Sequence, residues 1–254
     1  MLLDCTELVV RFGGLTALDG LSLSVDAGEV VGLIGPNGSG KTSFFNALTG
    51  IYALSSGKVR FAQDDLTGAA PQRVFAAGIT RTFQRSRLGL ELSIFDNVVL
   101  GALRRQPQGL WYNLVQRSAL NKDLLTLRER VFELLHVFNP QLAARMLEPA
   151  AAISIIDRRR VEICRALISE PRLLLLDEPS AGMTADETNH LMRDILVLRE
   201  RTPALAVILI EHDMAVIERI TQRVLVLNYG RLIAAGPYAE VARHPAVREA
   251  YLGV

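Results

Sequence analysis

The eight residues from 35 to 42 read Gly-Pro-Asn-Gly-Ser-Gly-Lys-Thr. They match the G-x-x-x-x-G-K-[ST] pattern, in which glycines allow backbone N–H groups to surround phosphate oxygens. An apolar run ending at Ile34 precedes the pattern, and a helix-like segment from Ser43 follows it. This context predicts a strand, a loop and a helix that bind a nucleoside triphosphate. The candidate binding residues are Gly35, Pro36, Asn37, Gly38, Ser39, Gly40, Lys41, Thr42 and Ser43.

Two side chains of this loop carry distinct chemistry. Lys41 is expected to contact the β- and γ-phosphates, and the Thr42 hydroxyl is expected to bind Mg²⁺. The helix that begins near Lys41 adds the positive end of its dipole to the phosphate site. A chance glycine-rich turn would lack the flanking strand and helix. The sequence therefore predicts a nucleoside triphosphate and Mg²⁺ as cofactors.

A pair of carboxylates ends a second apolar run. Four leucines, residues 173–176, are followed by Asp177 and Glu178. Ligands of open α/β sheets bind at the carboxyl ends of the strands, so both acids are expected at the ligand edge. Asp177 is expected to hold Mg²⁺, and Glu178 is expected to orient or polarise the attacking water. Without a P-loop in the chain, the same pair could be read as a solvated strand end.

Three further residues are weak evidence when each is taken alone. Gln84 precedes a helical block, where a side chain could sense the phosphate and transmit its state, and it is also a candidate Mg²⁺ ligand. His212 follows an apolar run, which places it at the same ligand edge as the acids. Phe12 could stack on a base. A lone glutamine or histidine is more often structural, and a lone phenylalanine is more often part of the core.

Composition narrows the classes of protein. The chain has 254 residues, half of them hydrophobic, which is enough for one large domain or two small ones. Its 28 basic and 27 acidic residues give a net charge of +1, which argues against a protein that coats nucleic acid. Cys5 and Cys164 are too far apart for a metal motif or a disulfide framework, so both are expected to pack in the core. We expect no signal peptide and no membrane-spanning segment.

The apolar periodicity predicts a mixed organisation. Residues 3–34 and 57–62 are typical of antiparallel strands joined by tight turns. From residue 153 onward, helices and strands alternate, which predicts a parallel α/β sheet with the preceding helical block as a separate lobe. The expected helices are 71–77, several within 95–147, 155–168, 186–201 and 213–221, and the expected later strands are 172–176, 204–210, 223–227 and 231–234.

The order of these motifs resembles the ATP-binding cassette of ABC transporters over almost the entire chain. The resemblance implies an α/β fold: a P-loop core with an antiparallel β subdomain and an inserted α-helical subdomain. The predicted segments are 1–94 for the β subdomain and first part of the core, 95–168 for the helical subdomain, and 169–254 for the rest of the core. It also implies roles for single residues: Phe12 stacks on adenine, Gln84 is the Q-loop residue, Asp177 is the Walker B acid, Glu178 is the catalytic carboxylate and His212 is the switch histidine.

Short segments are similar to ATPase subunits of branched-chain amino-acid importers, although urea and other amide importers share many of them. The segments are 79–84, 96–101, 159–163, 211–214 and 250–253. The length of 102–140 favours the larger of the two ATPase subunits that such importers use. The resemblance implies a peripheral position on the cytoplasmic face of the membrane and docking of permease subunits around Arg85–Ile94. It also implies indirect cooperation with a solute-binding protein outside the membrane, and no nucleic-acid partner.

One motif departs from the family pattern. The signature Leu-Ser-Gly-Gly-Gln should precede the helix that leads to Asp177, but the residues from Ile153 to Asp157 read Ile-Ser-Ile-Ile-Asp. In the family this segment presents a serine and backbone N–H groups to the γ-phosphate held by the other subunit, so Ser154 stays a candidate binding residue. Ile156 adds a branched side chain where glycine allows close approach, and Asp157 adds negative charge. Ser154 and Asp157 also fit an ordinary helix-capping pair.

The intact P-loop and the altered signature together predict asymmetry. In an ABC dimer each ATP lies between one P-loop and the partner's signature, so a heterodimer would have one competent and one impaired site. A homodimer would have two impaired sites, which makes it the less plausible assembly. The alternative functions are a nucleotide-gated regulatory subunit with little turnover, and a soluble ABC-type ATPase of DNA repair or translation.

Overall fold

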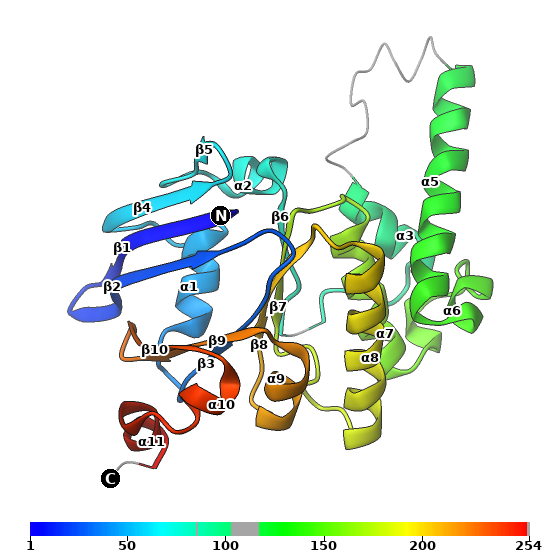
Figure 1. The fold of residues 1–254 in the computed structure, drawn as a ribbon. Helices are drawn as coiled ribbons and strands as arrows, with labels where there is room; N and C mark the ends of the chain where they lie inside the picture. The colour runs from blue at the N-terminus through cyan, green and yellow to red at the C-terminus, as the bar shows by residue number, and fades with distance from the viewer. Residues whose placement is uncertain (85, 103–116, 253–254) are drawn as a thin grey trace. The chain divides into compact units, whose positions relative to one another are not determined.

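The computed structural model describes residues 1–84, 86–102 and 117–252. Its contacts divide the chain into two compact units (Figure 1). The first unit comprises Met1–Arg81, Arg172–Ala181 and Arg199–Val254, and the second comprises Thr82–Pro171 and Gly182–Leu198. These compact units are defined by contacts alone and do not test the predicted subdomain boundaries, which stay a prediction. Arg85, at the start of the predicted docking surface, and residue 253 of the last family segment lie outside the described residues.

The first unit contains a four-stranded antiparallel sheet. Its order is β2 (Leu15–Val25), β1 (Leu3–Phe12), β4 (Ser56–Phe61) and β5 (Asp64–Asp65). The antiparallel strands predicted before residue 26 and at 57–62 are confirmed.

The second sheet of this unit has six strands in the order β10-β9-β3-β8-β7-β6. Strands β3, β6, β7, β8 and β9 run parallel, and β10 is antiparallel to β9. Their bounds are β3 Val30–Ile34, β6 Ile79–Arg81, β7 Leu173–Asp177, β8 Ala206–Ile210, β9 Arg223–Asn228 and β10 Arg231–Gly236. The prediction that the whole of 3–34 is antiparallel is wrong for β3, whose five buried residues are typical of a strand covered on both faces.

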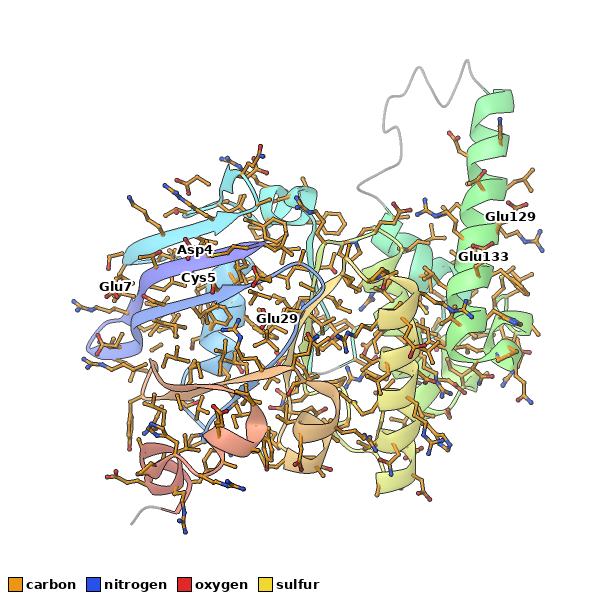
Figure 2. All side chains as sticks on the ribbon, in the orientation of Figure 1. Asp4, Cys5, Glu7, Glu29, Glu129 and Glu133 are labelled. Carbon is orange, nitrogen blue, oxygen red and sulfur yellow. The ribbon has the colours of Figure 1, made fainter. Side chains whose placement is uncertain are left out.

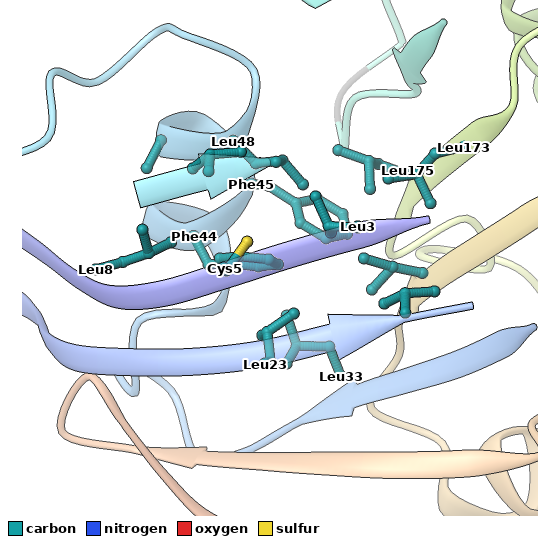
Figure 3. Close-up of a cluster of buried hydrophobic side chains, with 14 of the residues drawn as sticks. Leu3, Cys5, Leu8, Leu23, Leu33, Phe44, Phe45, Leu48, Leu173 and Leu175 are labelled. Atoms are coloured by element: carbon teal, nitrogen blue, oxygen red, sulfur yellow. The ribbon is translucent and has the colours of Figure 1, made fainter. Parts of the chain in front are cut away.

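One hydrophobic core joins the two sheets around helix α1 (Lys41–Leu48). Figure 3 shows Phe44 and Phe45 of this helix among leucines of β1, β3 and β7. Both phenylalanines are fully buried, and burying such a side chain stabilises the fold by about 1.5–3 kcal/mol. The helix that follows the glycine-rich loop is therefore held rigidly in the core.

Short helices complete the first unit. Helix α2 (Pro71–Ala77) begins at a proline, whose missing N–H is tolerated in the first turn, as predicted. Helix α9 (Met214–Ile220) is capped by Asp213, whose carboxylate accepts the backbone N–H groups of Ala215 and Val216. Helices α10 (Tyr238–Val241) and α11 (Pro245–Leu252) were not predicted.

The second unit is helical. Val131, Leu135 and Phe138 form the buried face of α5, whereas Glu129 and Glu133 are exposed (Figure 2). This spacing confirms the helical pattern predicted for the region. The helices are α3 (Ile94–Val99), α5 (Arg117–Phe138), α6 (Pro140–Ala144), α7 (Ile155–Leu167) and most of α8 (Ala185–Arg201), with 3₁₀ turns η1 (Leu100–Ala102) and η2 (Ala150–Ala152).

Both thiols are buried, as predicted. Cys5 and Cys164 are free, and burial raises the pKa of each thiol well above its usual range. Within the described ranges, no three His, Cys, Asp or Glu side chains are grouped closely enough to hold a metal ion by themselves. No helix within those ranges has the length and apolar character needed to cross a bilayer.

Candidate nucleotide-binding and catalytic site

The glycine-rich loop joins β3 to α1, as its sequence predicts. Two of its glycines are required because a neighbouring backbone carbonyl lies too close to leave room for a side chain. A Cβ on Gly35 would lie 2.1 Å from the Leu227 carbonyl oxygen, and a Cβ on Gly40 would lie 2.7 Å from that of Ala17. Gly40 caps α1 with a left-handed backbone and provides no side-chain hydrogen bond. The first N–H groups of the helix therefore remain available to an anion.

A cavity of about 310 Å³ lies against this loop and includes Glu178. The Ser39 side chain beside it is 2% exposed, and its hydroxyl oxygen has no hydrogen-bond partner among the described residues. Residues of the glycine-rich loop and of the first turn of α1 therefore border a hollow, which fits a phosphate chain. The lining residues are Leu15, Thr16, Ala17, Asn37, Gly38, Ser39, Gly40, Lys41, Thr42, Ser43 and Glu178.

The Lys41 side chain folds back onto its own loop. Its ammonium Nζ donates to the carbonyl oxygens of Gly35 at 2.7 Å and Pro36 at 2.9 Å. Burial lowers the pKa of Lys41, while the negative charges of Glu178 and Asp177 raise it. Lys41 therefore lies within electrostatic reach of both carboxylates. The loop, the lysine and the acid pair form one site in the first unit.

Strand register brings Glu178 and His212 to the same edge of the sheet. Asp177 of β7 pairs with Ile210 of β8, and the Glu178 N–H donates to the Ile210 carbonyl at 3.0 Å. The His212 Nε2 atom lies 2.8 Å from Glu178 Oε1. Glu178 has a φ of 47°, a left-handed backbone that costs a non-glycine residue about 1–3 kcal/mol. The sharp turn after the strand directs its carboxylate to the cavity.

Asp177 is paired with an arginine that was not among the predicted site residues. Arg81 Nη2 lies 2.6 Å from Asp177 Oδ2, and both side chains are almost fully buried. The same guanidinium donates to Asn46 Oδ1 of α1 and lies 5.2 Å from the centre of the Phe45 ring. Arg81 ends β6, which pairs directly with β7. It therefore ties the acid to the helix that follows the glycine-rich loop.

Two predicted metal ligands lie in the first unit. Thr42 borders the cavity, and Asp177 ends β7. Hydroxyl and carboxylate oxygens are the hard ligands that Mg²⁺ prefers. This donor chemistry fits a magnesium ion that accompanies a nucleotide.

Glu211 is a second residue of this site that was not among the predicted site residues. Its side chain is buried and accepts the Ser180 N–H at 2.9 Å and the His212 N–H at 3.3 Å. It therefore joins the loop after Glu178 to the loop that carries His212. Its position beside a candidate histidine, directly after a buried strand, was the available signal.

We expect the stability contributed by Glu211 to fall as the pH rises. Burial raises the pKa of Glu211 above its ordinary value of 4.5, although its hydrogen bonds to Ser180 and His212 partly oppose this effect. The protonated form is therefore favoured in the folded state, and this contribution is lost as the pH rises through the raised pKa. In general, each unit by which a carboxyl pKa is higher in the folded than in the unfolded state corresponds to about 1.4 kcal/mol of unfolding free energy lost on ionisation. Urea unfolding between pH 4 and 8 measures the free energy of unfolding of the parent and of Glu211→Gln. The variant should become more stable relative to the parent as the pH rises. A stability difference that does not change with pH would contradict this.

Phe12 lies on the surface of the first unit. It is 46% exposed, and its ring meets Tyr52 edge to face with 4.9 Å between centroids. The alternative that it is an ordinary core residue is therefore wrong. Its role as a stacking partner for adenine stays a prediction.

Gln84 and Ser154 belong to the second unit. Ser154 caps α7: its Oγ accepts the Asp157 N–H at 3.2 Å and donates to Asp157 Oδ2 at 2.9 Å. The predicted capping pair is confirmed. Because the hydroxyl is bonded to a carboxylate, negative charge lies directly beside the group that should meet a phosphate.

The two isoleucines that replace glycines form the first turn of α7. Ile155 is 61% exposed. Asp157 is further fixed by Asn139 at 3.2 Å and by Arg160 at 2.9 Å. The altered signature is thus a well-ordered helix start.

The family model described as "ABC transporter" matches residues 18–181, which include the P-loop and the acid pair. The chain belongs to the ABC transporter family. A second model, "Branched-chain amino acid ATP-binding cassette transporter", matches residues 231–254. This cassette is therefore a Mg²⁺-dependent ATPase, and its partners are the transmembrane permease subunits of a transporter.

Curated relatives align along nearly the whole cassette. It is 35% identical over 252 residues to the high-affinity branched-chain amino acid transport ATP-binding protein LivG of Salmonella typhimurium, covering 99% of this chain and 98% of that protein. It is 34% identical to BraF of Pseudomonas aeruginosa, with the same coverage. A probable LivG of Methanocaldococcus jannaschii is 31% identical, covering 98% of this chain and 96% of the relative.

Solved structures support the fold. A nucleotide-free ATP-binding cassette from an ABC transporter superposes with a TM-score of 0.84 at 29% identity, covering 100% of this chain and 99% of that one. An ATP-binding cassette in its ADP conformation gives the same values. The predicted fold class, a P-loop α/β core with antiparallel and helical parts, is confirmed.

Proposed function

We propose that this cassette hydrolyses ATP to drive an importer of branched-chain amino acids or a related amide or amino-acid solute. The observation that carries the proposal is the meeting of the P-loop, Glu178 and His212 at one edge of the sheet. The solute class follows from the relatives' names and from the matched segment 231–254. The cassette would work at the cytoplasmic face of the membrane.

Each site residue has a proposed task. Lys41 leaves the carbonyls of its own loop to contact the β- and γ-phosphates, while backbone N–H groups of the non-proline residues of the loop surround them. Thr42 and Asp177 would hold Mg²⁺, with Gln84 as a further predicted ligand, and the metal would neutralise charge on the phosphates. Glu178 polarises the attacking water, and His212 holds the Glu178 carboxylate in position. Phe12 stacks on adenine.

The helical subdomain would transmit the nucleotide state to the permease. We place the docking surface around Arg85–Ile94, of which residues 86–94 are described. Leu90 and Leu92 are 42% and 44% exposed there, and the backbone of this segment is fixed by Asn97, which bonds to Gly89 and Ser93. An ordered segment with exposed apolar side chains suits a protein partner.

We further propose a heterodimer with a second ABC ATPase subunit. The support is the Ser154–Asp157 bond together with the isoleucines at 155 and 156, which leave this chain's signature poorly suited to a phosphate. Its own P-loop and catalytic residues keep the family pattern. One composite site would then be active and the other impaired.

The test is Mg-ATP hydrolysis by the purified cassette, alone and mixed with a second ABC ATPase subunit encoded with the same transporter. We expect activity only in the mixture. Strong activity of the isolated chain would contradict the asymmetric heterodimer. No activity in any combination, with nucleotide still bound, would favour the alternative of a nucleotide-gated regulatory subunit.

A matched pair of variants tests the signature directly. Changing Ile155 and Ile156 to glycine restores the close backbone approach that a phosphate needs, so we expect faster turnover and tighter nucleotide binding in the dimer. Leu100→Gly, at another half-exposed apolar residue of the second unit, is the control for a general loss of side chains. Unchanged kinetics after the isoleucine substitutions would contradict the impaired signature.

A further inference from the structure

Helix α7 holds the backbone on the N-terminal side of the Q-loop through one buried arginine. Arg159 donates to the carbonyl oxygens of Phe83 at 2.9 Å and Gln84 at 3.1 Å. The same guanidinium pairs with Glu162 at 2.6 Å. Arg159 is 7% exposed and Glu162 is 2% exposed. All four residues belong to the second unit.

The same helix also holds the backbone after Gln84. Glu162 Oε1 accepts the Arg87 N–H at 2.9 Å, and Arg165 donates to the Arg87 carbonyl at 2.9 Å. The Arg87 guanidinium lies 4.1 Å from the centre of the Phe83 ring. Charged side chains of α7 therefore bind the chain on both sides of Gln84.

Because of these contacts, the Gln84 backbone can move together with α7 at a much lower energetic cost than it can move away from α7. Moving the Gln84 backbone away from α7 would break charge-assisted hydrogen bonds and leave buried charges without partners. Moving the backbone together with α7 breaks none of them. Since Ser154 caps the first turn of α7, a displacement at Gln84 that carries the helix also displaces Ser154.

We propose that Arg159 and Glu162 are positioning residues that make the Gln84 backbone and the first turn of α7 move as one body. A nucleotide-dependent change at Gln84 then reaches Ser154, the residue offered to the partner's ATP. This inference rests on the proposed function, because it assumes that Gln84 responds to the bound nucleotide.

The key variant removes both charges together. Arg159→Met/Glu162→Leu is expected to fold, because replacing a buried ion pair by apolar side chains is often neutral for stability, whereas removing one partner is not. Arg159→Lys keeps the charge but loses the planar fork that reaches two carbonyls. The matched control is Arg145→Met/Glu148→Leu, a pair at the same spacing and 2.7 Å apart that is nearly half exposed. Arg145 donates to Glu148 and to the Ala152 carbonyl, which lies outside the Q-loop.

Amide hydrogen exchange of the full chain, with and without Mg-ATP, gives the readout. All variants carry Glu178→Gln so that nucleotide is retained, and a fluorescent ATP analogue confirms its binding. In this background we expect Mg-ATP to change exchange both in the peptide containing Phe83 and Gln84 and in the peptide spanning residues 154–160. In Arg159→Met/Glu162→Leu we expect the second response to fall by roughly two- to thirtyfold while the first persists. Arg159→Lys should be intermediate, and the control pair should respond like the background.

Two results would overturn the inference, and they differ. If residues 154–160 respond fully in Arg159→Met/Glu162→Leu, Arg159 and Glu162 do not couple the two segments, although the ATPase function stands. If the background chain fails to bind the ATP analogue, the proposed function fails first and the coupling fails with it. Thermal unfolding of each variant separates loss of coupling from loss of folding.

Discussion

Glu178→Gln should lower the kcat for Mg-ATP hydrolysis by about 10²–10⁴-fold, the usual contribution of a positioned general base. The Glu178 carboxylate lies at the edge of the P-loop cavity and 2.8 Å from His212. An amide has nearly the same shape but cannot accept the proton of the attacking water. Nucleotide affinity should be kept or improved, because a negative charge is removed near the phosphates.

The measurement is phosphate release by the assembled dimer together with binding of a fluorescent ATP analogue. Glu218→Gln makes the same chemical change on the exposed face of α9 and should leave kcat unchanged. His212→Ala removes one hydrogen bond to a charged group, worth about 1.5–3 kcal/mol, so a smaller loss of roughly 10- to 150-fold is expected. A Glu178→Gln dimer that keeps more than a tenth of the parent rate would rule out Glu178 as the base.

Arg81→Gln should cost about 3–5 kcal/mol of unfolding free energy, because it removes the guanidinium that forms an ion pair with the buried Asp177 carboxylate. The pair is 2.6 Å apart, and its side chains are 6% and 4% exposed. Arg231 and Asp19 form a pair of the same type in the same unit, with 68% and 37% exposure. Arg231→Gln should cost less than about 1 kcal/mol, because solvent screens that pair.

Urea unfolding of the two variants and the parent measures the difference. Adding Asp177→Asn to Arg81→Gln should recover most of the loss, since the buried Asp177 carboxylate that had lost its arginine is then replaced by a neutral amide. Mg-ATP should stabilise Arg81→Gln more than the parent, because the metal gives Asp177 a new counter-charge. If Arg81→Gln costs no more than Arg231→Gln, Arg81 does not balance the charge of Asp177.

The sequence alone could predict those features whose residues lie close together along the chain. The P-loop needs only eight consecutive residues, and the Asp177–Glu178 pair is adjacent to the strand that positions it. Alternating apolar runs correctly located most of the later helices and strands. The capping bond of Ser154 was predictable because its partner lies three residues away.

Features that depend on distant partners could not be predicted in this way. Arg81 and Asp177 are separated by 96 positions, and Ser180 and Glu211 by 31. Strand β6 has three residues, too few to show a period of two. The direction of β3 is set by its neighbours β8 and β9, which the local pattern of apolar residues does not reveal.

The two buried thiols make this chain well suited to site-specific labelling. Cys5 and Cys164 are the only cysteines, and both combine burial with a raised pKa, so little thiolate is available to a maleimide or a nitroxide reagent. A cysteine introduced at the exposed Glu129 or Glu133 of α5 would be labelled selectively in the otherwise native sequence. With a second probe on the first unit, spectroscopic distances could follow the two units through an ATP cycle without prior removal of native cysteines.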